Sequence, residues 1–212
     1  MKTDDLIKAL AADAPMRQWP LAPVFAAAVL AGLAVAVAFF QYRLGVRGNA
    51  LESLGTVRFP FKFVVTLSLA LPAIYATYRL SRPNGDLGML WAALLVAPVL
   101  LAAGVALELI DVPAELWKTR LIGQNSSPCM YLIPVMALGP LAAMITVLRY
   151  GAVTQPRLAA LAAGLAAAGI GATLYAAHCP DDSPLFVATW YTIATGIVVL
   201  VSQLVAPRIV RW

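Results

Sequence analysis

The chain has 212 residues, of which 62% are hydrophobic and only 12% are charged, and its mean hydropathy is +0.84. Soluble domains are closer to half apolar and a quarter charged. The composition therefore excludes a soluble globular enzyme, a disordered tail and a nucleic-acid-binding module, and it predicts a membrane protein with several spans. The formal net charge of +5 bears first on membrane orientation rather than on nucleic-acid binding.

Six stretches are long and apolar enough, or nearly so, to cross a bilayer as helices, which takes about 20 residues each. In chain order they are Leu21–Phe40, Phe63–Tyr78, Leu87–Leu107, Met130–Leu148, Leu158–Ala177 and Leu185–Ala206. The second stretch reaches full length only if it starts near Phe59, with Lys62 extending to the membrane interface. The expected fold is an all-α integral membrane protein: residues 1–20 form an N-terminal segment, 21–206 the six-helix domain and 207–212 a C-terminal tail.

Basic residues predict the orientation, because they are enriched in cytoplasmic loops. With the N-terminus inside, the inner side holds nine basic and four acidic residues, a net charge of +5, and the outer side holds six of each, a net charge of 0. We therefore expect both termini in the cytoplasm. The basic residues of the first outer loop are expected to contact lipid headgroups; they are Arg43, Arg47, Arg58 and Lys62.

The outer loops are long enough for two short helices. Asn49 followed by Glu52 has the pattern of a capping box. Pro113 and Glu115 mark the start of a second helix, and Gly123 marks its end, in a pattern typical of a helix that lies on the membrane surface. The centres of the six spans contain no Asp, Glu, Lys, Arg or His, so nothing there indicates an ion or proton path.

The two cysteines have the most informative placement. Cys129 opens the fourth span and Cys179 closes the fifth, and a short inner loop joins these spans, so both thiols are expected side by side on the outer side. Adjacent helix ends can meet the geometry of a disulfide, and Met130 and His178 add soft and imidazole ligands that suit copper(I) or zinc. Small buried hydrophobic residues or a structural disulfide are the alternative interpretations.

The N-terminus has a second pattern. Thr3 can cap a helix that carries Asp4 in its first turn, where the helix dipole favours an acid. Leu6, Ile7 and Leu10 would then form one apolar face. Such a helix can dock in the groove of a cytoplasmic partner. The alternative is that it lies on the bilayer, since about ten residues make a marginal helix alone.

Several segments resemble the NrsF family, and the resemblance covers essentially the whole chain. They are Met1–Ile7, Cys129–Pro134, His178–Phe186 with the sequence His-Cys-Pro-Asp-Asp-Ser-Pro-Leu-Phe, Trp190-Tyr191 and Arg211-Trp212. The family consists of bacterial inner-membrane anti-sigma factors, usually with six spans, that restrain an extracytoplasmic-function (ECF) sigma factor. The resemblance implies that Cys129 and Cys179 match two periplasmic cysteines implicated in sensing metal or oxidative stress.

The resulting hypothesis is a multi-pass inner-membrane anti-sigma factor, not an enzyme, that releases an ECF sigma factor when its outer thiols change state. The residues expected to hold the sigma factor are Asp4, Leu6, Ile7 and Leu10. The residues expected to sense the metal or oxidant are Cys129, Cys179 and His178, with a transient copper- or zinc-like ion as the only cofactor considered.

Two other function classes compete with this hypothesis. A membrane thiol oxidoreductase that passes electrons to quinone would be expected to carry a Cys-x-x-Cys pair, which the chain lacks. A small metal transporter would be expected to carry ionisable groups at its span centres, and these are absent.

Overall fold

The computed structural model describes residues 3–4, 7, 20–83 and 85–210, and every regular element within them is helical. The long helices are α2 (Leu21–Arg43), α4 (Arg58–Leu80), α5 (Leu90–Asp111), α7 (Ser126–Tyr150), α8 (Pro156–His178) and α10 (Thr192–Val210). The short ones are α3 (Ala50–Ser53), α6 (Ala114–Ile122), α9 (Pro184–Phe186) and the π-helical turn η1 (Val187–Tyr191).

Six helical stretches in the described part are long and apolar enough to cross a membrane, in agreement with the predicted number. The second, α4, has 23 residues and starts at Arg58, which agrees with the start near Phe59 that the predicted stretch needs to reach full length. Helix α4 includes Lys62. The side chain of Lys62 is fully buried inside the bundle and does not extend to the membrane interface as predicted. The sixth, Pro184–Val210, is interrupted near its start by η1, a π-turn that the apolar run did not predict.

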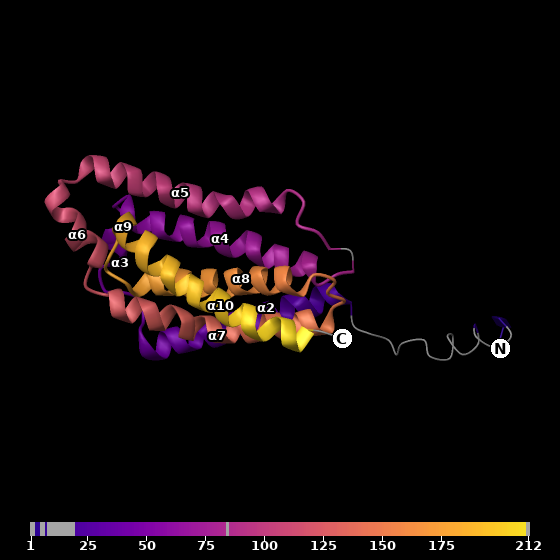
Figure 1. The fold of residues 1–212 in the computed structure, drawn as a ribbon. Helices are drawn as coiled ribbons and strands as arrows, with labels where there is room; N and C mark the ends of the chain where they lie inside the picture. The colour runs from indigo at the N-terminus through magenta and orange to yellow at the C-terminus, as the bar shows by residue number, and fades with distance from the viewer. Residues whose placement is uncertain (1–2, 5–6, 8–19, 84, 211–212) are drawn as a thin grey trace.

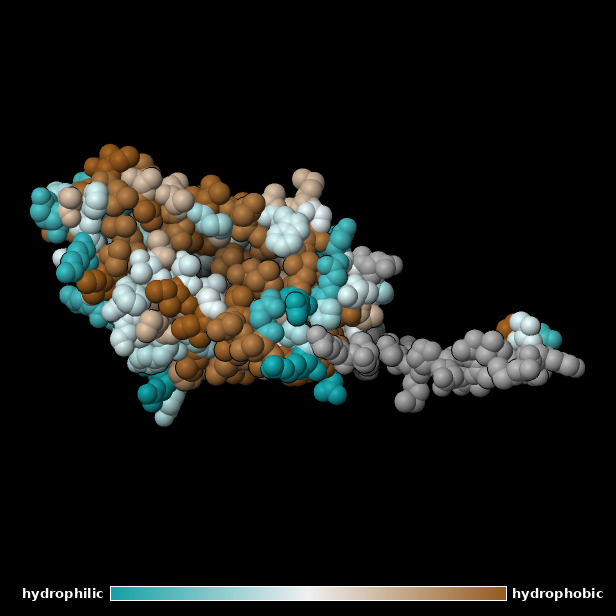
Figure 2. Space-filling model, viewed as in Figure 1, coloured by the Kyte–Doolittle hydropathy of each residue, from teal (hydrophilic) through white to brown (hydrophobic). Residues whose placement is uncertain are grey.

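The helices form an elongated bundle in which α5 lies along the outside (Figure 1). We call the end that holds α3, α6 and α9 the cysteine end. At the opposite end, here the terminal end, α2 begins and α10 finishes, as expected for an even number of passes. Hydrophobic residues cover most of the middle of the face in Figure 2, and hydrophilic residues gather towards both ends, which is the distribution that a bilayer requires.

The central helix is α8, which packs against α4, α7 and α10. Its glycines allow the helix backbones to approach closely. A Cβ atom added to Gly169 would lie 2.8 Å from the Cα atom of Ala70 in α4, and one added to Gly171 would lie 2.8 Å from the carbonyl oxygen of Ile133 in α7. Helix α8 is therefore in backbone contact with two neighbours, and a shift of one helix must be accommodated by the others.

The two short helices expected in the loops are present as α3 and α6. Helix α6 ends at Gly123, whose φ of 58° is readily adopted by glycine, so the predicted end is confirmed. The predicted capping box of α3 is wrong, because the Asn49 side chain makes no capping hydrogen bond. The φ of −97° and ψ of 22° at Asn49 are not the extended values of an N-cap, and its carbonyl accepts from the Ser53 amide and hydroxyl instead.

Candidate functional site

Both thiols lie in one buried cluster at the cysteine end. Cys129 lies in the first turns of α7 and Cys179 directly follows α8, and neither side chain has any exposed surface. They pack in the same hydrophobic cluster as Tyr175, Phe186 and Tyr191, which we call the thiol cluster. The predicted proximity of the two helix ends is thereby confirmed, and both cysteines are free thiols.

The surroundings of Cys179 favour the protonated thiol. Burial raises the pKa of Cys179 to about 11, and the positive charge of Lys62 offsets part of that rise. The sulfur is 4.0 Å from the carbonyl oxygen of Asp181, a long contact in which the thiol donates. Because the thiolate is the reactive form, an agent that acts on Cys179 must displace the proton, which soft metal ions do when they bind sulfur.

Two tyrosines border the sulfur atoms. The Tyr175 ring is fully buried and its centroid is 6.0 Å from that of Tyr191. Neither hydroxyl has a hydrogen-bond partner at standard distance among the described residues. The Tyr175 hydroxyl interacts with the Cys179 side chain over a longer distance. Within the described part of the chain the Tyr191 hydroxyl is unpaired, which costs free energy, so an altered sulfur or a bound ion could engage it.

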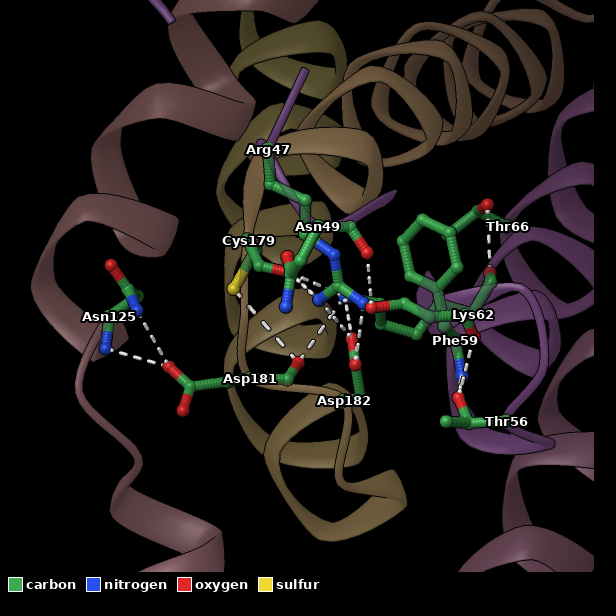
Figure 3. Close-up of polar contacts among 11 residues, drawn as sticks. Arg47, Asn49, Thr56, Phe59, Lys62, Thr66, Asn125, Cys179, Asp181 and Asp182 are labelled. Carbon is green, nitrogen blue, oxygen red and sulfur yellow. Dashed lines mark hydrogen bonds and ion pairs between the residues drawn. The ribbon is translucent and has the colours of Figure 1, made fainter. Parts of the chain in front are cut away.

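The chain between α8 and α9, residues 179–183, is the cysteine turn. Its main partner is Lys62 of α4, whose ammonium lies 2.6 Å from Asp182 Oδ1 (Figure 3). The same ammonium donates to the carbonyl oxygen of Cys179 at 2.8 Å and to that of Asp181 at 3.4 Å. A fully buried cation is therefore matched by a carboxylate and two carbonyls, which offset the cost of removing it from water.

Arg47, from the loop before α3, reaches the cysteine turn from another direction (Figure 3). Its guanidinium makes two parallel contacts with the Asp182 carboxylate at 3.0 and 3.1 Å and a longer one with the Cys179 carbonyl at 3.3 Å. The guanidinium also lies over the Phe59 ring, 4.0 Å from its centroid. Bidentate pairing and stacking fix an arginine in one orientation, so Arg47 and Lys62 together hold Asp182.

Asp181 connects the cysteine turn to the helix that carries the other cysteine. Its carboxylate accepts from the amides of Gln124 and Asn125 at 3.1 and 2.9 Å, directly before α7 starts (Figure 3). An acid at a helix N-terminus is favoured by the helix dipole. The Asn125 carbonyl in turn accepts from the Cys129 amide at 2.9 Å. The surroundings of both thiols are thus joined through one carboxylate.

A second buried carboxylate, Glu108 of α5, lies beside the turn. It pairs with Arg120 of α6 at 2.7 Å and with Arg58 of α4 at 3.8 Å, and Ser183 donates to it at 3.0 Å. Its side chain is 1% exposed. Ser183 therefore ties the end of the cysteine turn to the peripheral helix α5, which otherwise packs mainly against α4.

The expectation that the basic residues of the first outer loop contact lipid headgroups is wrong for Arg47 and Lys62. Both are buried and paired with Asp182, and Arg58 is half-exposed beside Glu108. The sequence contained an indication, since the outer side has equal numbers of acidic and basic residues. Equal numbers predict pairing, but they do not tell which residues pair.

His178, the third residue of the predicted sensor, ends α8. Its Nδ1 atom lies 3.1 Å from the carbonyl oxygen of Gly45, a contact that ties the ring to the loop before α3. Across the described ranges, no three His, Cys, Asp or Glu side chains are grouped closely enough to hold a metal ion. Cys129, Cys179 and His178 therefore form no preassembled three-ligand site, and metal binding there stays a prediction.

The predicted sigma-binding segment is only partly described. Asp4 and Ile7 are helical and exposed, which is compatible with a docking surface. Leu6 and Leu10 lie outside the described residues. Nothing in the described structure tests the role of this segment, so it stays a prediction.

Comparison with known proteins gives one consistent result. The family described as NrsF, negative regulator of sigma F, matches residues 10–212. A probable anti-sigma-F factor from Azospira oryzae (strain ATCC BAA-33 / DSM 13638 / PS) is 32% identical over the full length of both chains. An anti-sigma-F factor from Caulobacter vibrioides (strain NA1000 / CB15N) is 35% identical, again over the full length of both. No solved structure matches the chain.

Proposed function

The chain belongs to the NrsF family of negative regulators of sigma F, and on that premise we propose that it is an inner-membrane anti-sigma factor controlled by its two thiols. In the resting state its N-terminal segment holds an ECF sigma factor at the cytoplasmic face. A periplasmic metal ion or oxidant then acts on Cys129 and Cys179. The sigma factor is released and directs transcription.

One observation carries the sensory part of the proposal. Cys129 and Cys179, 50 positions apart, share one buried cluster at the end of the bundle opposite the start of α2. If all six apolar helices cross the bilayer, the N-terminal segment lies on the other side of the membrane from this cluster. A thiol sensor and a cytoplasmic docking segment can therefore be separated by the bilayer and connected only through the helices.

The free energy needed to couple the thiols to sigma-factor binding is modest. A hundredfold loss of affinity for the sigma factor corresponds to about 2.7 kcal/mol of coupling between the two ends. An agent shifts a two-state equilibrium only by its preference for one state. A metal ion held by two sulfurs, or a disulfide, can supply a preference of this size.

The direct test replaces each cysteine with serine and measures transcription from a sigma-dependent promoter after copper, zinc or a thiol oxidant is added. We expect Cys129→Ser and Cys179→Ser to abolish or strongly reduce induction, because neither variant can form a bridge between two sulfurs. Membrane levels of each variant are measured in parallel. Ser127→Ala, an exposed position beside Cys129, is the matched control and should be induced normally. Normal induction in both cysteine variants would refute the thiol sensor.

A further inference from the structure

The hydrogen bonds of the Lys62 ammonium all go to one short segment. Its side chain is 0% exposed, and its ammonium contacts Asp182 at 2.6 Å, the Cys179 carbonyl at 2.8 Å and the Asp181 carbonyl at 3.4 Å. An ammonium group has three hydrogens to donate. Residues 179–182 therefore supply three acceptors for the three donors of this cation.

The Cys179 thiol donates to one of the acceptors that Lys62 also uses. Its sulfur donates to the Asp181 carbonyl, which is also an acceptor for Lys62, and the backbone carbonyl of Cys179 itself accepts from Lys62. When a soft metal ion binds the sulfur, the thiol proton leaves to water and the contact with Asp181 loses its donor. Any movement of the sulfur towards the ion then acts on a backbone segment that Lys62 holds.

Lys62 belongs to a helix that runs from the cysteine end to the terminal end (Figure 1). Halfway along, Ala70 lies in backbone contact with Gly169 of α8. At the terminal end, the carbonyl of Ser81, directly after α4, accepts from the amide of Ala152 in the loop between α7 and α8 at 3.0 Å. A displacement of α4 at Lys62 therefore reaches the loops at the terminal end through contacts that already exist.

We propose that Lys62 is the positioning residue through which the state of Cys179 reaches α4. With the free thiol, the cysteine turn encloses the ammonium and holds α4 in the arrangement that retains the sigma factor. When a thiol oxidant takes two electrons and two protons from Cys129 and Cys179 to form a disulfide, or when a metal ion replaces the thiol proton, the turn moves. Helix α4 then shifts because a buried ammonium cannot be left without acceptors. This inference rests on the proposed function of sigma-factor retention.

The test compares Lys62→Met with Lys62→Arg in full-length protein in cells, without added metal or oxidant. Methionine approximates the shape of the lysine side chain without its charge, whereas arginine is larger but keeps the cation. We expect Lys62→Met to raise sigma-dependent transcription at least tenfold and Lys62→Arg to keep most of the repression. A role in packing alone would give the opposite order. Lys118→Met, an exposed cation of α6 at the same end of the bundle, should leave repression and induction unchanged.

A second arm separates this inference from the thiol sensor. In the Cys179→Ser chain, adding Lys62→Met should still raise transcription, because Lys62 acts after the thiol. If the cysteine variants are induced normally, the sensor proposal fails. The Lys62 inference is then still tested by sigma-dependent transcription in cells without added metal or oxidant. If the sensor proposal holds and the double variant stays fully repressed, the Lys62 inference fails.

The other possible results with the Lys62 variants also support or contradict the inference. Normal repression and induction by Lys62→Met, at normal membrane levels, would overturn the inference. So would equal loss of repression in the methionine and arginine variants, since that would show a requirement for the native shape and not for the cation. If Lys62→Met does not accumulate in membranes, the isosteric Asp182→Asn replaces it. Loss of repression there supports the inference, and normal behaviour contradicts it.

Discussion

Cys179 combines a reactive side chain with surroundings that suppress its reactivity. Burial raises its pKa to about 11, so at neutral pH the thiolate is a very small fraction. This arrangement protects the resting sensor from weak electrophiles. It also favours agents that bind sulfur strongly enough to displace the thiol proton, such as soft metal ions.

The raised pKa predicts a distinctive pH profile for alkylation. In a Cys129→Ser chain, we expect the reaction of Cys179 with uncharged iodoacetamide to accelerate up to about pH 10, about tenfold per pH unit, because the thiolate is still increasing there. Mass spectrometry of the labelled protein gives the rates. An exposed thiol introduced by Ser127→Cys into the double Cys→Ser chain should level off above about pH 9. A similar plateau for Cys179 would show that its pKa is not raised.

Lys62 and Asp182 were outside the reach of sequence reasoning, although the residue types are easy to see. A lysine near the end of an apolar run is ordinarily expected to extend to the interface. Only the fold brings it to Asp182, and Arg47 reaches the same carboxylate from 135 positions away. Such pairs depend on three-dimensional proximity, which a single sequence does not specify.

At the level of helices, apolar length was sufficient to predict six spans, and turn-forming residues predicted α6 and its end at Gly123. The ends of the spans were less predictable, because polar residues such as Lys62 and Glu108 are accommodated by pairing inside the bundle. The π-turn η1 had no counterpart in the apolar pattern. It contributes Tyr191 to the thiol cluster, in keeping with the tendency of π-turns to occur at functional sites.

The N-terminal segment is the element expected to bind the sigma factor. We expect Leu6→Asp and Leu10→Asp to reduce co-purification of the sigma factor at least tenfold, because a charge on the apolar face would have to be buried in the partner's groove. Lys8→Asp introduces an acid off that face and is the matched control. Full retention by both leucine variants would mean that other segments hold the sigma factor.

For the molecule as a whole, the cysteine turn connects four separate segments through only five residues. It contacts α4 through Lys62, the loop before α3 through Arg47, α5 through Ser183 and the start of α7 through Asp181. It also joins α8 covalently to α9. The location of both cysteines at one end followed from the order of the spans, but this connectivity did not, since it depends on side chains from four separate segments.

The most direct test of the central claim measures the affinity of the co-purifying sigma factor for the chain reconstituted in lipid nanodiscs. The comparison is between fully reduced protein and the same protein loaded with copper(I) or treated with a thiol oxidant. We predict about hundredfold weaker binding after treatment, equivalent to about 2.7 kcal/mol, and no change in a chain that lacks both cysteines. Equal affinity before and after treatment, with modification of Cys129 and Cys179 verified by mass spectrometry, would contradict the account.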